Sequence, residues 1–222
     1  MIPHPVLPPA QGSIIEVVPI ARSRRAANAG LRLPAQPLNR DELRAVLRTC
    51  SRRYSCPLRL RALIVVMWRT GIRCEEAVSL RLRDLDRDEG TIRVQRGKGG
   101  KPRTVAMDET GWTMLAEWTD RRRELGIGDG FVFCTLHGGK LDKSFVRRSV
   151  RRAAKRADVG VRVHPHGLRH TFTAELVREG VGIVLLQRML GHASLAHTSR
   201  YAASVGATAE LVAVAKGRPA PW

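Results

Sequence analysis

HGLRH at residues 166–170 is the centre of the pattern that decides the fold of this chain. Upstream of it lie TGIRCEEAVSL at residues 70–80 and GKGGKPR at residues 97–103, and LGHASLAHTSRY follows at residues 190–201. Together these stretches contain two arginines, a lysine, two histidines and a tyrosine that we expect to act together: Arg73, Lys98, His166, Arg169, His192 and Tyr201.

This combination of side chains suits the cleavage of a phosphodiester without a metal ion. Planar guanidinium groups match the non-bridging oxygens, which carry extra negative charge in the transition state. Tyrosine is a poor nucleophile because its pKa is about 10, and nearby cations make its oxyanion easier to form. The residue types therefore predict a reaction rather than only a class of ligand.

The composition indicates a polyanionic partner. The chain has 222 residues with 43% hydrophobic residues, enough for one domain with a real core and an arm. Its net charge is +19, from 39 Lys and Arg against 20 Asp and Glu. Such a surplus favours contact with phosphates. Charge alone leaves a solvated basic surface or a nonspecific RNA binder as alternatives.

The cysteines and the N-terminal sequence point to the cytoplasm. Cys50, Cys56, Cys74 and Cys134 form no CxxC pair, so we expect reduced thiols rather than disulfides or a zinc knuckle. The stretch MIPHPVLPPAQGS at the start does not resemble a signal peptide. The longest apolar run, residues 62–68, is too short to cross a bilayer. We therefore expect a cytoplasmic, nucleoid-associated protein.

The order of elements predicts a mainly α fold with a small antiparallel β-sheet (α+β). Residues 1–35 are rich in Pro, Ala and Arg and suggest a flexible arm or linker. Asn39 and Glu42 form a potential capping box. TIRVQ and RTVAM flank a glycine-rich turn and predict a hairpin, and FVFC at 131–134 predicts a short strand or buried extended segment. Asp108 is expected to cap a helix in which Trp112, Leu115 and Trp118 recur at core spacing. The other helices are expected at about 40–50, 57–70, 73–81, 142–157, 167–179, 183–190, 194–202 and 207–215.

The helix expected at 142–157 is strongly basic. Spacing of four places most of its cations along one side, away from Phe145, Val146, Val150 and Ala153. A solvated face is the simpler interpretation, but acidic partners are almost absent, which favours contact with phosphates. With two residues of the hairpin, we predict these DNA-binding side chains: Lys101, Arg103, Arg147, Arg148, Arg151, Arg152 and Lys155.

Each stretch taken alone also has a simpler interpretation. Arg73 can be a helix-start arginine paired with Glu76, and spacing does not separate Lys98 from Lys101. His166 and His170 have the spacing of a metal pair, with His164, His192 and His197 as further candidates: no cysteine or carboxylate completes a set, so we expect no metal. An isolated tyrosine such as Tyr201 is more often a core aromatic than a nucleophile.

Taken together, the four stretches resemble the catalytic domain of the tyrosine recombinases, the phage integrase-like family, over residues 36–222. The family pattern is an arginine after TG[LI], a lysine in a GKGxKxR hairpin, HxLRH, LGH, and a tyrosine nine residues past the last histidine. All six positions are filled here in the right order. Glu76 falls where the family has an acidic residue that supports the first arginine.

The resemblance implies a site-specific DNA recombinase or integrase that needs no cofactor. Tyr201 would attack the scissile phosphate, giving a 3′-phosphotyrosine and a free 5′-hydroxyl. The non-bridging oxygens would be bound by Arg73, Arg169 and His192. Lys98 would protonate the leaving 5′ oxygen and His166 would assist proton transfer at the tyrosine.

The resemblance also implies double-stranded DNA as partner and a homo-tetramer on the DNA synapse. The segment TAELVAVA at 208–215 would then either dock on a neighbour or pack on its own domain. Family members carry a separate N-terminal domain that clamps DNA, and we expect it to be absent because residues 1–35 alone precede the catalytic domain. Two alternatives remain: a type IB topoisomerase-like enzyme that relaxes DNA, and a DNA-binding regulator that keeps the fold without turnover.

Overall fold

The computed structural model describes residues 36–95 and 102–191. The chain divides into two units, Met1–Pro34 and Ala35–Trp222. The arm predicted at residues 1–35 lies outside the described residues and stays a prediction, and the same holds for the helices expected at 194–202 and 207–215. None of the described helices is long and apolar enough to cross a membrane.

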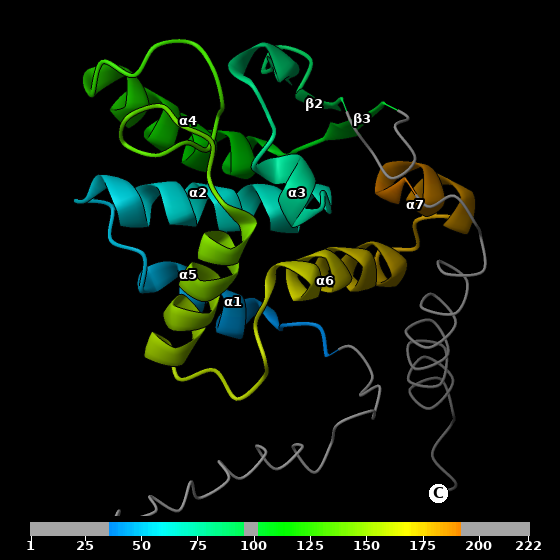
Figure 1. Cartoon of the computed structure of the whole chain (residues 1–222). Coiled ribbons are helices and arrows are strands. Elements are labelled where there is room, and N and C mark those ends of the chain that lie inside the picture. The colour runs from blue at the N-terminus through cyan, green and yellow to red at the C-terminus, as the bar shows by residue number, and fades with distance from the viewer. Residues whose placement is uncertain (1–35, 96–101, 192–222) are drawn as a thin grey trace, which may run out of the picture. The chain divides into compact units, whose positions relative to one another are not determined.

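The described residues form the mainly helical fold with a small antiparallel sheet that the sequence predicted (Figure 1). The elements in chain order are α1 (Arg40–Arg48), α2 (Ser55–Thr70), α3 (Cys74–Ala77), η1 (Leu82–Asp84), β1 (Leu85–Asp86), β2 (Thr91–Val94), β3 (Arg103–Ala106), α4 (Glu109–Glu124), α5 (Lys143–Arg156), α6 (Pro165–Arg178) and α7 (Ile183–Leu190).

Helix α2 is the centre of the core, and Figure 1 shows it passing between α4 and the helices α5 and α6. Its sequence LIVVM is apolar on every side, as expected for a helix surrounded by other elements. Ile64, Val66 and Met67 are completely buried. Trp118 of α4 packs into the same core and its indole N–H donates to the carbonyl of Val132 at 2.8 Å.

Local capping signals set where the helices begin. The predicted capping box of α1 is confirmed, because the side chains of Asn39 and Glu42 each accept the other's backbone N–H at 2.8 Å. Asp108 caps α4 as predicted, accepting from the N–H of Gly111 at 2.7 Å. Asp142 does the same for α5, accepting from two backbone N–H groups. Such caps satisfy donors that have no partner within the helix.

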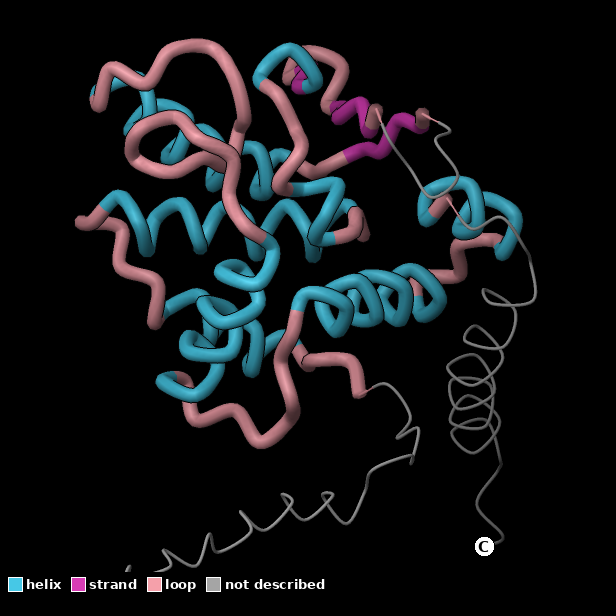
Figure 2. Tube along the Cα trace, in the orientation of Figure 1, coloured by secondary structure: helices cyan, strands magenta, loops and turns pink. Residues whose placement is uncertain are grey.

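The predicted hairpin is confirmed as strands β2 and β3, which pair antiparallel with Ile92 opposite Val105 and Val94 opposite Arg103. Strand β1 adds to the other edge of β2, so the sheet order is β1-β2-β3. Alternate residues point inward, because Ile92, Val94 and Val105 are buried. Strand β3 also contacts α7, which joins the sheet to the end of the helical layer (Figure 2).

One helix is shorter than the sequence predicted, and the predicted apolar segment at 131–134 is buried without forming a regular strand. Helix α3 covers only Cys74–Ala77 instead of 73–81, because the next backbone bonds are of the tighter three-residue type and the carbonyl of Leu80 accepts from Val132 instead. Val132, Phe133 and Cys134 are buried, and the segment forms isolated bridges, one of them between Arg81 and Phe131. The chain therefore leaves α3 through a turn and then pairs with the segment around Phe131.

Candidate active site

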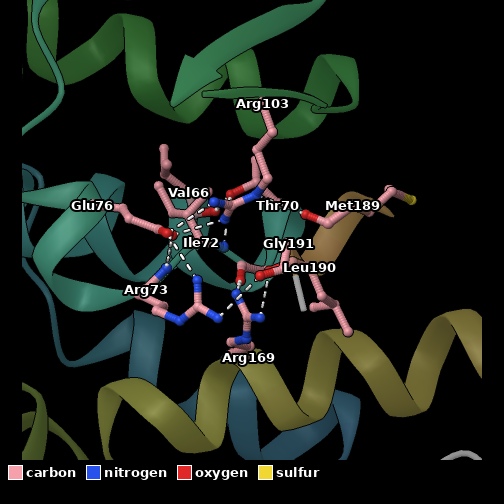
Figure 3. Close-up of polar contacts among 11 residues, drawn as sticks. Val66, Thr70, Ile72, Arg73, Glu76, Arg103, Arg169, Met189, Leu190 and Gly191 are labelled. Carbon is pink, nitrogen blue, oxygen red and sulfur yellow. Dashed lines mark hydrogen bonds and ion pairs between the residues drawn. The ribbon is translucent and has the colours of Figure 1, made fainter. Parts of the chain in front are cut away.

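The turn that carries Arg73 is fixed by the end of helix α2. The hydroxyl of Thr70 donates to the carbonyl of Val66 at 2.6 Å, and Gly71 adopts a left-handed conformation with φ of 64°. Ile72 is completely buried and anchors the turn (Figure 3). Arg73 is therefore held at the start of α3, with its guanidinium directed toward Glu76.

Glu76 binds two arginines at once. The backbone N–H of Arg73 donates to Oε2 at 2.6 Å and its Nη1 donates to Oε1 at 3.0 Å. Arg103 adds a two-pronged contact, with Nη1 and Nη2 donating to the two carboxylate oxygens at 2.8 Å each. Burial acts to raise the pKa of Glu76, but the bonds from Arg103 and Arg73 outweigh it and lower that pKa to about 2. The carboxylate is therefore ionised at any working pH.

Arg169 lies on α6 and closes the other side of the cluster. Its Nη1 donates to the carbonyl of Gly71 and its Nη2 to the carbonyl of Leu190, both at 2.6 Å. These carbonyls belong to the C-terminal ends of α2 and α7, where the helix dipole favours a cation. One guanidinium thus joins three helices, and Arg169 is only 3% exposed.

The cluster holds more positive than negative charge. The guanidinium groups of Arg73 and Arg169 point toward one another below Glu76 in Figure 3. Burial and the cation of Arg73 lower the pKa of Arg169 to about 9, and Glu76 only partly offsets this. Three guanidinium groups around one carboxylate destabilise one another unless a further anion binds. A phosphate group has the charge and the oxygen geometry for that role.

His166 lies at the start of α6, close to the arginines. The N-cap of this helix is His164, whose Nδ1 accepts from the N–H of Gly167 at 3.0 Å. The ring of His166 is exposed and meets the ring of His170 edge-on, with centroids 4.3 Å apart. Partial desolvation, followed by the positive charges of Arg169, His164 and Arg73, lowers the pKa of His166. It is therefore a neutral imidazole at pH 7.

Of the histidines that we considered for zinc, His164, His166 and His170 lie in the described residues, and His192 and His197 lie outside them. No three His, Cys, Asp or Glu side chains of those residues are placed to hold an ion together. His166 and His170 pack against each other as a ring pair instead.

The structure therefore brings together Arg73, Glu76, His166 and Arg169 from the predicted set. Lys98, Lys101, His192 and Tyr201 lie outside the described residues. Their roles stay predictions, but Gly191, which directly precedes His192, accepts a bond of 3.5 Å from Nη2 of Arg73. The chain thus leads into the LGH histidine from a point next to the arginine cluster.

Arg103 is placed differently from the expectation that it contacts DNA. Its side chain is 10% exposed and its three guanidinium nitrogens donate to Glu76 and to the carbonyl of Met189. A signal for this was present in the sequence. Arg103 is two residues before Val105 in the strand, so the alternation of side chains puts both on the inward face.

Helix α5 presents the predicted basic surface. Val146, Val150 and Ala153 are buried, whereas the cationic side chains are exposed: Arg147, Arg148, Arg151, Arg152 and Lys155. Phe145, which we expected on the side away from the cations, is 40% exposed at the first turn. Nearby, Lys143 donates to Glu75 of α3 at 2.8 Å. The basic helix therefore begins beside the helix that carries Glu76.

Comparison with known proteins agrees with this geometry. Residues 36–206 match the model of the phage integrase family. The chain is 39% identical over 145 residues to tyrosine recombinase XerC of Oceanobacillus iheyensis, covering 63% of this chain and 47% of that protein. It is 33% identical over 190 residues to tyrosine recombinase XerD of Mycobacterium tuberculosis, covering 82% of this chain and 60% of that protein. The chain thus spans about half the length of these relatives.

Solved structures show the same fold. The crystal structure of XerA recombinase superposes with a TM-score of 0.72 at 31% identity, covering 83% of this chain and 66% of that chain. The XerH site-specific recombinase, bound to palindromic difH substrate in a post-cleavage complex, superposes with a TM-score of 0.67 at 28% identity, covering 81% of this chain and 52% of that chain.

Proposed function

This chain belongs to the phage integrase family, the tyrosine recombinases, and we propose that it breaks and rejoins DNA strands through a 3′-phosphotyrosine intermediate. The observation that carries the proposal is the buried cluster in which Arg73 and Arg103 bind the Glu76 carboxylate while Arg169, held by two backbone carbonyls, lies close enough to interact with Arg73 and Glu76. This cluster is suited to an anion, and the resemblance to the family assigns the scissile phosphate to it.

The chemistry assigns one step to each group. The Tyr201 hydroxyl oxygen attacks phosphorus, and the bond between phosphorus and the 5′ oxygen breaks. Arg73, Arg169 and His192 stabilise the charge on the non-bridging oxygens. Lys98 gives a proton to the 5′ oxygen, leaving a free hydroxyl. The attack of a 5′-hydroxyl from a partner strand reverses these steps and joins the strands.

The properties of His166 support its role in removing the tyrosine proton. An imidazole must be neutral to accept a proton, and the lowered pKa of His166 keeps it neutral at pH 7. Its exposed ring, on the helix that also carries Arg169, is accessible to a side chain outside the described residues.

We further propose that duplex DNA lies along α5, beside the arginine cluster. The exposed cations of α5 give a row of phosphate contacts, and Lys143 joins this helix to α3. XerH binds a palindromic substrate. A palindrome matches a twofold pair of protein copies, so we expect this chain to bind a comparable site in pairs.

The full assembly that we propose is a homo-tetramer on two DNA duplexes. Three consecutive apolar side chains of α7 are exposed, Ile183 by 38%, Val184 by 55% and Leu185 by 54%. Exposed apolar groups of this kind favour contacts between proteins.

Deletion of residues 206–222 tests the docking of the C-terminal segment on a neighbouring copy. Single-site cleavage should persist and strand exchange should disappear. Loss of cleavage together with folding would instead place the segment in its own core.

The central experiment uses labelled duplex DNA with a palindromic candidate site and a nick close to the cleavage position. Cleavage releases a short strand whose 5′-hydroxyl diffuses away, so the covalent adduct accumulates. The wild-type chain should give a band of slower mobility that protease removes, and Tyr201→Phe should bind the same DNA without forming it. An adduct of equal yield in Tyr201→Phe would refute the assigned nucleophile.

A further inference from the structure

We propose that Arg103 is a positioning residue for catalysis, which holds three segments of the active site together, rather than a DNA contact. The inference rests on the proposed function, since it concerns the rate of DNA cleavage. The observation behind it is that one guanidinium group donates to three separate acceptors from two other elements (Figure 3).

The first link joins the hairpin to the arginine pair. Arg103 is the first residue of β3, and its partner in the ladder is Val94, the last residue of β2. The residues between these strands in the chain, 95–102, include Lys98. Since Nη1 and Nη2 of Arg103 both bind Glu76, the open end of the ladder is fixed to the carboxylate that also binds Arg73.

The second link joins the same strand to the end of α7. Nε of Arg103 donates to the carbonyl of Met189 at 3.0 Å. Gly191 packs directly against the arginine, because a Cβ atom there would lie 3.0 Å from Cδ of Arg103. His192 is the next residue in the chain. The position at which the chain enters the LGH histidine therefore depends on where the Arg103 side chain lies.

The geometry requires an arginine. A guanidinium fork can bind both oxygens of a carboxylate and still donate from Nε, whereas a lysine ammonium has one donor atom. Glu76 is 3% exposed and Arg103 is 10% exposed, so water does not easily replace a broken hydrogen bond. Arg103→Lys thus keeps the charge and breaks the three-way link.

The test measures single-turnover adduct formation by the full chain on nicked duplex DNA at saturating concentration, beside the DNA dissociation constant. Arg103→Lys should lower the adduct rate by about 10- to 100-fold, the scale expected when catalytic groups are misplaced by an ångström. The dissociation constant and its salt dependence should be unchanged. The final amount of adduct should also be unchanged, because partial unfolding would lower the amount and misplacement lowers the rate.

The matched control is Arg87→Lys. Arg87 also forms an ion pair with a carboxylate of another element, Glu109, at 2.8 Å, but this pair is exposed at the surface. Its adduct rate should equal that of the wild type. If Arg103→Lys forms adduct at the wild-type rate, or if it weakens DNA binding and reduces the salt dependence by the equivalent of one phosphate, the inference is overturned. No adduct from the wild-type chain would overturn the proposed function and this inference with it.

A second variant tests the link from the other partner. Glu76→Gln keeps the shape of the side chain and removes the charge that both arginines share. The double variant with Arg103→Lys should be no slower than the slower single variant, because both changes break one linkage. Rate losses that multiply would show that Arg103 acts independently of Glu76 and would overturn the inference. Should Arg103→Lys fail to fold, Glu76→Gln alone must show the rate loss with unchanged DNA binding.

Discussion

Replacement of Gly71 by alanine should be among the most damaging single-methyl changes in this chain. Gly71 ends α2 with φ of 64°, and its carbonyl accepts from Arg169. A Cβ atom there would lie 2.3 Å from Cδ1 of Phe172 on α6, far inside contact distance. The left-handed backbone costs an alanine about 1–2 kcal/mol, and overpacking costs about 1–3 kcal/mol more. We therefore expect a loss of about 2–5 kcal/mol in the free energy of unfolding.

Gly126 provides a matched control for the steric part. It follows α4, which has the same length as α2, and its φ is 66°. Apart from its own atoms and its two chain neighbours, nothing lies within 4 Å of the position that its Cβ would take. Gly126→Ala should therefore cost only the left-handed term, about 1–2 kcal/mol.

Urea unfolding of both variants measures the difference. Gly71→Ala should be less stable than Gly126→Ala by about 1–3 kcal/mol, the part due to Phe172. Its adduct rate should also fall, since relief of the clash moves the helix that carries Arg169 away from its acceptor. A difference below about 0.5 kcal/mol, within the usual scatter of surface changes, would refute the close packing of α2 on α6.

Three further predictions concern DNA, pH and the leaving group. Replacing Arg148 and Arg152 by Ala should flatten the slope of log affinity against log salt by about 0.9 for each phosphate that the helix no longer binds, and an unchanged slope would remove α5 from the interface. Burial and nearby His166 lower the pKa of His170 to about 4, below its value of about 6.5 in the unfolded chain. Because protonation then favours the unfolded chain, the contribution of His170 to the free energy of unfolding is complete above about pH 6.5 and falls by up to about 3 kcal/mol as the pH drops toward 4. Urea unfolding of His170→Gln should show a smaller fall between pH 7.5 and 4.5, whereas an equal fall would contradict the assignment. The Lys98→Ala variant should cleave ordinary DNA slowly. DNA with sulfur in place of the leaving 5′ oxygen should restore the cleavage rate, because sulfur leaves without a proton. Equal slowing on both substrates would contradict the role of Lys98 as the acid.

The elements that were predicted correctly have local signals. The capping box at Asn39 and Glu42 marks the start of α1, and the apolar run of α2 identifies a buried helix. The hairpin follows from two β-rich segments around a glycine-rich turn. Each signal lies within a few residues of the element that it specifies, so it can be read without knowledge of the rest of the fold.

The contacts that organise the site could not be predicted in this way. Arg103 and Glu76 are 27 residues apart, and Arg169 binds carbonyls that lie at the ends of two other helices. Whether a cation in a basic sequence faces DNA or a buried carboxylate depends on which elements pack together. The side-chain alternation of β3 places Arg103 on the same face as the buried Val105, although we predicted it to contact DNA.

The length of α3 was wrong for a related reason. Its predicted end was based on helical residue types, but the carbonyl of Leu80 is used by Val132, a partner 52 residues away. The N–H groups of Ser79 and Leu80 bind carbonyls three residues earlier, and Arg81 then bridges to Phe131, so the chain leaves the helix to pair with a distant segment. Long-range backbone pairing of this kind leaves no pattern in the sequence.

The central claim is that Tyr201 becomes covalently joined to the 3′ phosphate of a cleaved strand. The most direct measurement is peptide mass spectrometry of the trapped adduct after digestion of the protein and the DNA. The account predicts one modified peptide, with the nucleotide remnant on Tyr201 and a free 5′-hydroxyl on the released strand. A remnant on Tyr54 or any other side chain, or a 5′-phosphate on the released strand, would contradict it.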